Sequence, residues 1–142
     1  PDPEAAGIAR AISLAVAEGD VKPSEGLYIN AHGTSTKLND SSETAGIKRA
    51  LGEDAARAAH VSSTKSMTGH EMWMAGASEV VYSMLMMRHG FIAPNINFTE
   101  GDEATSKLNI PVRRVDTEFD CFLSNSFGFG GTNSTLIVKK YK

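Results

Sequence analysis

The sequence has little cysteine and no long apolar run, and both absences narrow the classes of protein that it can encode. The one cysteine, Cys121, excludes an internal disulfide framework and a cysteine-based zinc site, and it fits a reducing cytoplasm. The longest weakly polar stretch, residues 72–87, contains Ser78, Glu79 and Ser83 and is therefore too short and too polar to cross a bilayer. No charged and then apolar leader opens the chain. We expect a cytoplasmic protein with no membrane partner.

Charge and composition indicate an ordinary globular domain. The net charge of −3 argues against nucleic acid as the main partner. Hydrophobic residues make up 41% and charged residues 22% of the chain, which excludes a disordered protein. A length of 142 residues suits one domain with its own core. The chain begins directly at a helix-start pattern, Asp2-Pro3-Glu4, as if cut from a longer polypeptide.

Helical and strand patterns alternate along the chain. Apolar residues recur at helical spacing from Ala5 to Val16, and Gly19 should end this helix. A second helix should begin at Asp40 or Ser41 and run to the region of Leu51. Short apolar strands are expected at residues 27–30, 60–63, 120–125 and 134–138. Strands that alternate with helices favour a mixed or parallel sheet.

The segment from Gly69 to Arg88 has the most distinctive pattern. Its apolar residues, between Met72 and Met87, cover every side of a helical wheel. A helix without a polar face is typically buried on all sides. The segment therefore predicts a layered α/β body with a buried central helix.

Three polar segments directly follow predicted strands, where open α/β folds build their sites. They are residues 30–36 (Asn-Ala-His-Gly-Thr-Ser-Thr), 63–70 (Ser-Thr-Lys-Ser-Met-Thr-Gly-His) and 124–133 (Ser-Asn-Ser-Phe-Gly-Phe-Gly-Gly-Thr-Asn). Taken singly, each has an ordinary structural interpretation. A histidine in a strand-to-helix turn is commonly a structural hydrogen-bonding residue, and glycine-rich turns are usually only turns.

Several other motifs do not fit these segments. The glycine-rich run lacks the lysine of a phosphate loop, and Asn133 stands where a dinucleotide fingerprint requires glycine. His70 and Glu71 begin like a zinc-protease helix, but Met74 occupies the position of the second histidine.

In this order, the three segments together resemble those of the β-ketoacyl-ACP synthases of the thiolase superfamily, and the resemblance covers nearly the whole chain. His-Gly-Thr-Ser-Thr at 32–36 and Met-Thr-Gly-His at 67–70 favour the fatty-acid type, and two histidines mark the synthase I/II branch. Phe129 stands where thiolases carry a second cysteine. The resemblance implies a thiolase-like layered α/β/α/β/α fold with a mixed sheet. Residues 1–142 would form its C-terminal half without the first strand of that half, and the N-terminal half would be absent.

The resemblance implies a decarboxylative Claisen condensation in fatty-acid elongation. A cysteine of the N-terminal half holds an acyl chain as a thioester; malonyl-ACP loses carbon dioxide, and the resulting carbanion attacks that thioester. No cofactor is required beyond the phosphopantetheine of the acyl carrier protein (ACP), which carries the substrate. The implied partners are ACP, the protein's own N-terminal half and a second copy in a homodimer. Without the nucleophilic cysteine, this part of the acyltransferase would be inactive alone.

The resemblance also implies roles for individual residues. His32 and His70 match the catalytic pair, whose neutral imidazoles would donate hydrogen bonds to an enolate-like oxygen. For His70, a helix N-terminus would disfavour the imidazolium. Lys65 would organise the site and its charge. The other matches are Phe129 (a gate whose N–H forms half of the acyl oxyanion hole), Thr34, Thr36 and Phe127 (contacts of the phosphopantetheine arm), and Asp40 and Glu43 (support for the Lys65 region).

Glu79 needs a partner, because a lone carboxylate buried in an apolar helix is very costly. Several members of the family bind a structural monovalent cation near the matching glutamate. The corresponding ligands here would be Asn30, Glu79, Ser124 and Asn125. Alternatively, Glu79 accepts hydrogen bonds from backbone or serine donors, and the sequence does not decide between the two.

Cys121 lies within an apparent strand, beside Phe119 and Phe122 and with no base adjacent, so we expect a structural thiol and not a nucleophile. Two other functions stay open. One is a non-catalytic, chain-length-factor-like subunit of a type II polyketide or polyene system, and the other is a module that only binds pantetheine. The intact histidine motifs favour the synthase.

Overall fold

A mixed sheet forms the centre of the molecule. The computed structural model describes residues 4–23, 26–103 and 105–142. Within them, four strands pair in the order β2-β1-β5-β6. β1 (Leu27–Asn30) runs parallel to β2 (His60–Ser62) and to β5 (Cys121–Phe127), and β6 (Asn133–Lys139) is antiparallel to β5. The predicted mixed sheet and the positions of its strands are confirmed.

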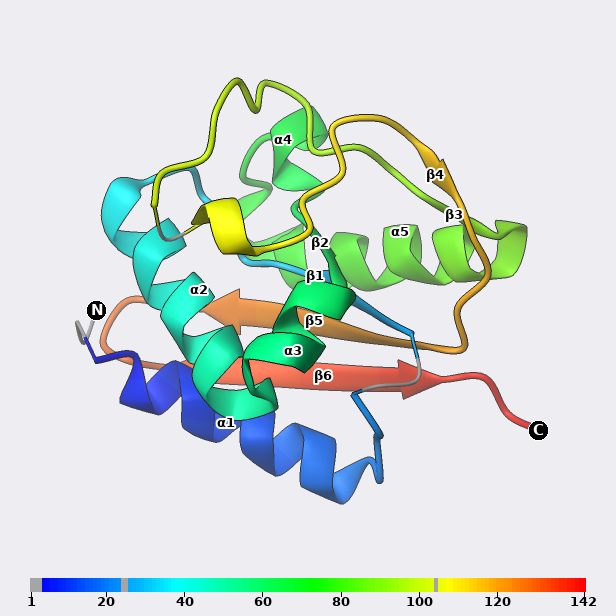
Figure 1. The fold of residues 1–142 in the computed structure, drawn as a ribbon, viewed down its shortest axis with the longest axis horizontal. Coiled ribbons are helices and arrows are strands. Elements are labelled where there is room, and N and C mark those ends of the chain that lie inside the picture. The colour runs from blue at the N-terminus through cyan, green and yellow to red at the C-terminus, as the bar shows by residue number, and fades with distance from the viewer. Residues whose placement is uncertain (1–3, 24–25, 104) are drawn as a thin grey trace.

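Helices cover both faces of this sheet (Figure 1). On the near face lie α1 (Ala6–Glu18), α2 (Lys37–Leu51) and α3 (Glu53–Ala58), and on the far face lies α5 (Ala75–His89). The shorter elements are α4 (Lys65–Thr68), the 3-10 helices η1 (Met72–Met74) and η2 (Thr105–Lys107), and the antiparallel pair β3 (Phe91–Ile92) and β4 (Val115–Asp116).

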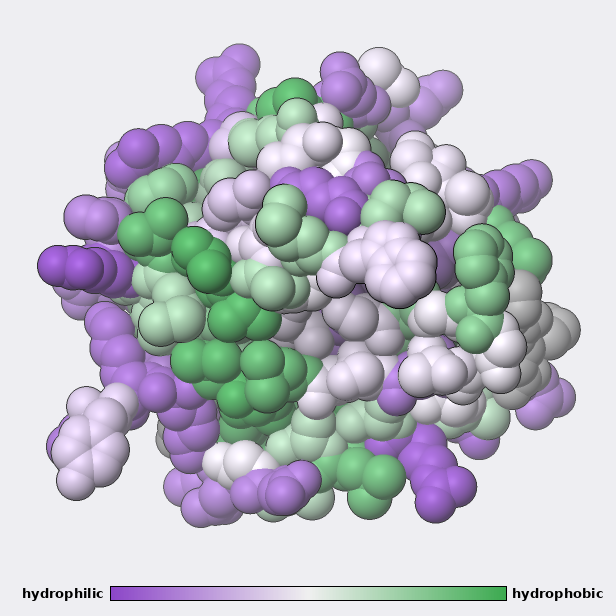
Figure 2. All heavy atoms as spheres, turned by 180° about the vertical axis from the view of Figure 1, so that it is seen from behind, coloured by the Kyte–Doolittle hydropathy of each residue, from purple (hydrophilic) through white to green (hydrophobic). Residues whose placement is uncertain are grey.

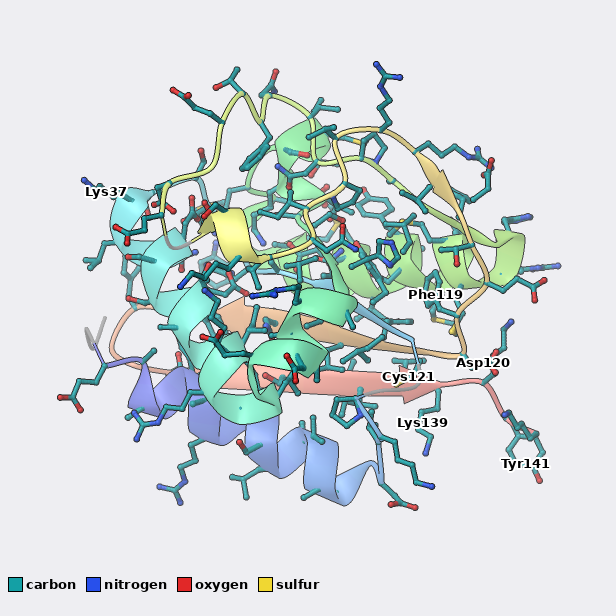
Figure 3. The ribbon with its side chains drawn as sticks, viewed as in Figure 1. Lys37, Phe119, Asp120, Cys121, Lys139 and Tyr141 are labelled. Atoms are coloured by element: carbon teal, nitrogen blue, oxygen red, sulfur yellow. The ribbon has the colours of Figure 1, made fainter. Side chains whose placement is uncertain are left out.

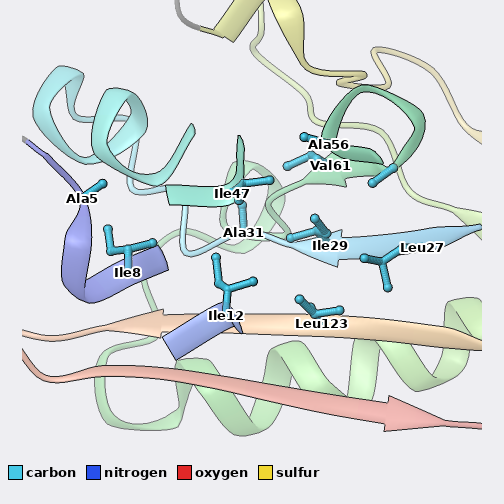
Figure 4. Packing of buried hydrophobic residues seen from close by; sticks show 11 residues of the cluster. Ala5, Ile8, Ile12, Leu27, Ile29, Ala31, Ile47, Ala56, Val61 and Leu123 are labelled. Carbon is cyan, nitrogen blue, oxygen red and sulfur yellow. The ribbon is translucent and has the colours of Figure 1, made fainter. Parts of the chain in front are cut away.

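The alternation of side chains along the strands divides the core into two clusters. Ile29 and Leu123 pack against α1 and α2, together with Ile12 and Ile47 (Figure 4). The other set of strand residues, including Tyr28 and Phe122, faces α5, where Met86 and Met87 complete the second cluster. Each face of the sheet is therefore closed by its own helices.

Helices α1 and α2 begin at positions other than the predicted ones. The expected cap of α1, Asp2 and Pro3, lies outside the described residues, and the helix begins at Ala6, after Ala5 in a left-handed conformation (φ 53). α2 begins at Lys37, ahead of the predicted start, because the Thr36 side chain caps it by accepting the N–H of Asn39. The loop that carries the first polar segment is correspondingly shorter.

The prediction that α5 is buried on all sides is wrong for this chain taken by itself. Its buried face carries residues such as Glu79, Ser83 and Met86. On the opposite face Val81, Met84 and Leu85 are 54%, 48% and 46% exposed, and an apolar patch lies on part of the far side of the molecule (Figure 2). One sheet can cover only one side of a helix, and no second layer packs on α5 within the described residues. None of the described helices is long and apolar enough to span a membrane.

Candidate active site

The three polar segments meet at one edge of the sheet. They follow β1, β2 and β5, which are parallel, so their carboxyl ends lie on the same side. The ring centroids of His32 and His70 are 5.8 Å apart, with the ring planes at 86°. The ring centroid of Phe127, at the end of β5, lies 5.6 Å from that of His32. The structure thus brings together two histidines that are far apart in sequence.

Glu43 fixes the loop that carries His32. Its Oε1 accepts the N–H of His32 at 2.9 Å, and its Oε2 accepts the N–H of Gly33 at 3.0 Å. Oε1 also accepts a hydrogen bond from the side-chain amide of Asn125 at 3.2 Å. Burial raises the pKa of Glu43 and outweighs these hydrogen bonds, which lower it. A carboxylate of α2 therefore ties the ends of β1 and β5 to each other.

Gly33 is required for this loop to approach the second polar segment. Its φ is +42°, and a Cβ at this position would lie 2.6 Å from the Cβ of Ser63. The Ser63 hydroxyl donates to the carbonyl of Gly33 at 3.1 Å. No larger residue fits here without moving the loop.

Burial keeps His32 neutral. The pKa of His32 is lowered to about 4, chiefly by burial and further by Lys65 and His70. Its Nδ1 is shielded from solvent and has no hydrogen-bond partner among the described residues. At physiological pH this side chain is an uncharged imidazole.

A turn, and not the start of a long helix, determines which ring nitrogen of His70 carries the proton. α5 begins only at Ala75, so the predicted position of His70 at a helix N-terminus is wrong. His70 is exposed and follows Gly69, which has a φ of +74°. The N–H of Met72 donates to the Nδ1 of His70 at 3.0 Å. Because Nδ1 accepts, the neutral imidazole carries its proton on Nε2 and can donate from that atom.

Lys65 pairs with Glu79. The Nζ of Lys65, the first residue of α4, donates to the Oε1 of Glu79 on α5, and the two side chains are only 5% and 3% exposed. Burial raises the pKa of Glu79, and the hydrogen bond from Lys65 counteracts this. The sequence did not predict this pair, and it suggested only a cation or neutral donors as partners of Glu79. The available signal was one acid in an apolar helix, which needs a compensating partner when it is buried.

The carboxylates predicted to support Lys65 have other contacts. Glu43 influences Lys65 only through space, since its hydrogen bonds go to Asn125 and to the His32 loop. Asp40 is half-buried near the start of α2, where its pKa is raised by burial and lowered by the side chain of Asn39 and the backbone of Ser35. The direct carboxylate partner of Lys65 is Glu79 on α5.

The four residues predicted to hold a cation do not all share one face of the sheet. Asn30 and Ser124 are register partners in β1 and β5, and Asn30 donates to the Ser83 hydroxyl of α5 at 3.3 Å. Asn125 is the next residue along β5, so its side chain points to the other face, where Glu43 and Thr135 bind it. Two buried oxygens, Oδ1 of Asn30 and Oε2 of Glu79, have no hydrogen-bond partner among the described residues.

A cavity of about 370 Å³ opens beside His70. Its lining includes Thr34, Lys65 and His70. The hydroxyl of Thr34 lies 3.3 Å from that of Thr36. Phe129 is fully exposed in the glycine-rich loop, which the N–H of Gly128 closes by donating to the carbonyl of Thr132 at 2.8 Å. No group of three or more histidine, cysteine or acidic residues that could hold a metal occurs in the described part of the chain.

Cys121 lies at the far end of β5 from this site. It is the first residue of the strand and a register partner of Lys139, whereas Phe127 at the last position contacts His32. Six residues of strand separate the two positions by about 20 Å. Burial raises the pKa of the Cys121 thiol, with Lys139 opposing the shift. In Figure 3, Cys121 and Lys139 lie at the opposite end of the molecule from Lys37, which follows the Thr34–Thr36 loop.

Comparison with known proteins decides the family. Residues 1–99 match the model of the β-ketoacyl synthase C-terminal domain. The chain belongs to the β-ketoacyl synthase family. This β-ketoacyl synthase chain is 49% identical over 115 residues to 3-oxoacyl-[acyl-carrier-protein] synthase 1 of Escherichia coli (strain K12), covering 81% of the chain and 28% of that protein.

Two further relatives cover almost the whole of this synthase chain. It is 44% identical over 142 residues to 3-oxoacyl-[acyl-carrier-protein] synthase 2 of Synechocystis sp. (strain ATCC 27184 / PCC 6803 / Kazusa), covering 100% of the chain and 34% of that protein. It superposes on the ishigamide ketosynthase/chain length factor with a TM-score of 0.90 and 37% identity, covering 98% of the chain and 34% of that structure. These similarities confirm the predicted family and its thiolase-like fold. The chain spans about a third of the length of the curated relatives it matches.

Proposed function

We propose that the protein to which this chain belongs is a β-ketoacyl-ACP synthase of fatty-acid elongation, and that this chain supplies its decarboxylating histidines. The observation that carries the proposal is the facing pair His32 and His70, one kept uncharged by burial and the other with a donor at Nε2. Two imidazole donors at one edge of the sheet suit an oxygen on which negative charge develops. The names of the relatives, 3-oxoacyl-ACP synthases 1 and 2, agree with this chemistry.

In the proposed reaction, the bond between the malonyl α-carbon and its carboxylate breaks, and carbon dioxide leaves. The electron pair passes to an enolate whose oxygen accepts hydrogen bonds from His32 and His70. The enolate carbon then attacks an acyl thioester on the nucleophilic cysteine, forming a carbon–carbon bond and releasing the thiolate. The N–H of Phe129 would donate to the oxygen of that thioester, with the side chain as a gate. Thr34, Thr36 and Phe127 would contact the phosphopantetheine arm of ACP.

The nucleophile and the missing layer would come from a preceding part of the polypeptide. Two features support this: the exposed apolar face of α5, and the outer edge of β6, which pairs only with β5 among the described residues. An open edge and an apolar face of this kind are normally covered. We propose that the first strand of the half pairs with β6, that the N-terminal half covers α5, and that the assembled protein is a cytoplasmic homodimer that binds ACP.

A structural monovalent cation is a secondary proposal. The two partnerless oxygens, of Asn30 and Glu79, lie in the part of the core that also holds Ser124 and suit a hard cation. Asn125 could contribute only its main chain. A crystal grown in rubidium salt should show anomalous density beside Asn30 and Glu79; a water molecule with no anomalous signal there would exclude the ion.

Of the two alternatives, the chain-length-factor-like subunit is supported by the ishigamide ketosynthase/chain length factor, which shares the fold. It predicts no condensation by the protein itself. A module that only binds pantetheine predicts association with ACP and no release of carbon dioxide. An assay that follows both carbon dioxide release and chain extension by the full-length protein separates the synthase from both alternatives.

The proposal predicts how decarboxylation depends on pH. Because the pKa of His32 is about 4, His32 stays neutral well below the pH at which an ordinary histidine, with a pKa of about 6.5, becomes charged. Carbon dioxide release from malonyl-ACP by the full-length protein should be nearly constant from about pH 7 to about pH 5 and should fall towards about pH 4. Circular dichroism at each pH separates this loss from acid unfolding. Loss of half of the carbon dioxide release near pH 6.5 would contradict the role given to a neutral His32. No release at any pH would reject the proposed function.

A second prediction concerns Cys121. Its raised pKa and its distance from the histidines should make it a slow target for iodoacetamide. Mass spectrometry of the full-length protein after brief treatment should find the label on another, upstream cysteine, with turnover blocked, and Cys121→Ser should keep most of the activity. First labelling at Cys121, together with an inactive Cys121→Ser variant, would show that the nucleophile has been assigned to the wrong half.

A further inference from the structure

Glu71 joins the turn after His70 to helix α5. Its Oε1 accepts a hydrogen bond from the hydroxyl of Tyr82 on α5 at 3.1 Å. Its backbone carbonyl accepts the N–H of Met74 at 3.2 Å, which closes η1. The pKa of Glu71 is lowered, most by the Ser78 hydroxyl and also by that of Tyr82, so the side chain is a carboxylate. One residue therefore ties the start of η1 to the Tyr82 side chain of α5.

Met72 is the reason why this turn needs to be held. Its φ is 54°, in the left-handed region that residues other than glycine rarely adopt. Its N–H donates to the Nδ1 of His70 at 3.0 Å. Backbone in such sparsely populated conformations persists only where surrounding contacts hold it. Glu71 precedes Met72 and is held by Tyr82, and Met74 follows Met72 and is bound to Glu71, so these contacts enclose Met72.

The position of the Met72 N–H decides which nitrogen of His70 is a donor. While Nδ1 accepts that N–H, the neutral imidazole carries its proton on Nε2. If the turn relaxes, the proton can lie on Nδ1 instead, and Nε2 becomes an acceptor with a lone pair. An acceptor facing an enolate oxygen repels it, whereas a donor stabilises it.

We propose that Glu71, bound to Tyr82, is a positioning residue that holds the Met72 N–H against His70 and so keeps His70 in its Nε2–H form. Its effect on turnover rests on the proposed function, but its effect on the tautomer does not, since the tautomer is a property of the enzyme without substrate. Glu71 itself contacts no reacting atom. It acts through Met72 on a residue that does.

Three substitutions in the full-length enzyme separate this role from a general structural one. Tyr82→Phe removes only the hydroxyl, Glu71→Ala removes the acceptor, and Glu71→Gln keeps an oxygen acceptor. We expect the first two to lower kcat for malonyl-ACP decarboxylation about ten-fold or more, since misplacing a catalytic group by about 1 Å can cost up to ~10²-fold. KM should stay within about two-fold, and Glu71→Gln should remain close to wild type. The matched controls, Tyr141→Phe and Glu53→Gln, change exposed residues outside the site and should have no effect.

Nuclear magnetic resonance of the enzyme labelled with ¹⁵N-histidine reports the tautomer directly, with His70→Asn to assign the signal. Wild type should show His70 protonated on Nε2, and Tyr82→Phe should show a mixture of both forms. Wild-type kcat and an unchanged tautomer in Tyr82→Phe and Glu71→Ala would overturn the proposal, as would a fall in kcat with an unchanged tautomer. If the wild-type enzyme releases no carbon dioxide, the proposed function fails, while a changed tautomer in the variants still supports the role of Glu71.

Discussion

Replacing either histidine with alanine in the full-length synthase should nearly abolish decarboxylation of malonyl-ACP while leaving acylation of the nucleophilic cysteine measurable. His32 and His70 are the paired imidazoles at the edge of the sheet. Removing one preorganised donor to a developing oxyanion typically costs ~10²–10³ in kcat. In the proposed function, transfer of the acyl chain to the cysteine would depend on other donors, among them the N–H of Phe129, and it should fall much less.

The measurement follows acyl transfer and carbon dioxide release in parallel for each variant. His89→Ala is the matched control, because His89 is an exposed histidine at the end of α5 and should leave both rates unchanged. A variant of His32 or His70 that decarboxylates at the wild-type rate would remove that histidine from the proposed role. Equal loss of both half-reactions would point to a collapsed site and not to a lost donor.

Glu79→Ala should strongly destabilise the folded protein. It leaves the ammonium of Lys65 in the interior without its carboxylate, where both side chains are at most 5% exposed. Breaking a buried ion pair by removing one partner typically costs about 3–5 kcal/mol, because the remaining charge is uncompensated. Urea denaturation of the full-length protein at fixed protein concentration should show this loss in the free energy of unfolding.

Two further variants make this experiment specific. Arg114 and Asp116 form an exposed pair, with 59% and 77% of the side chains accessible, so Asp116→Ala should cost no more than about 1 kcal/mol. The double variant Lys65→Met/Glu79→Leu removes both charges and should recover most of the stability. It should nevertheless be inactive if Lys65 organises the charge of the site. A double variant that is both stable and active would show that the pair is dispensable, and a Glu79→Ala loss no larger than that of Asp116→Ala would show that its burial is unimportant.

The parts of the molecule that the sequence predicts well depend on local patterns. The four strands lie where short apolar runs placed them, and the polar segments that follow β1, β2 and β5 meet because parallel strands end at one edge. His32, His70 and Phe127 could therefore be assigned to one site from the sequence alone. Phe129 and the threonines lie at this edge too, and their roles stay predictions.

The parts that the sequence does not predict depend on contacts between distant segments. The all-apolar pattern of α5 predicted burial on all sides, but only one face of the helix packs within the described residues, and the other face is exposed. The pairing of Glu79 with Lys65 and the closure of the His32 loop by Glu43 depend on how α5 and α2 pass the strand ends. The turn at Met72 has no sequence signal, because its φ of 54° is unusual for methionine.

The most direct test of the proposed function is the mass balance of a single turnover. Full-length enzyme is first acylated from acyl-ACP, separated from free substrate, and then mixed with malonyl-ACP labelled in its free carboxylate. We expect each acylated site to release one labelled carbon dioxide and to form one β-ketoacyl-ACP, two carbons longer than the starting chain, with the cysteine thiol regenerated. An acyl-enzyme that binds malonyl-ACP but releases no carbon dioxide and extends no chain would contradict the assignment of His32 and His70 to a decarboxylating condensation.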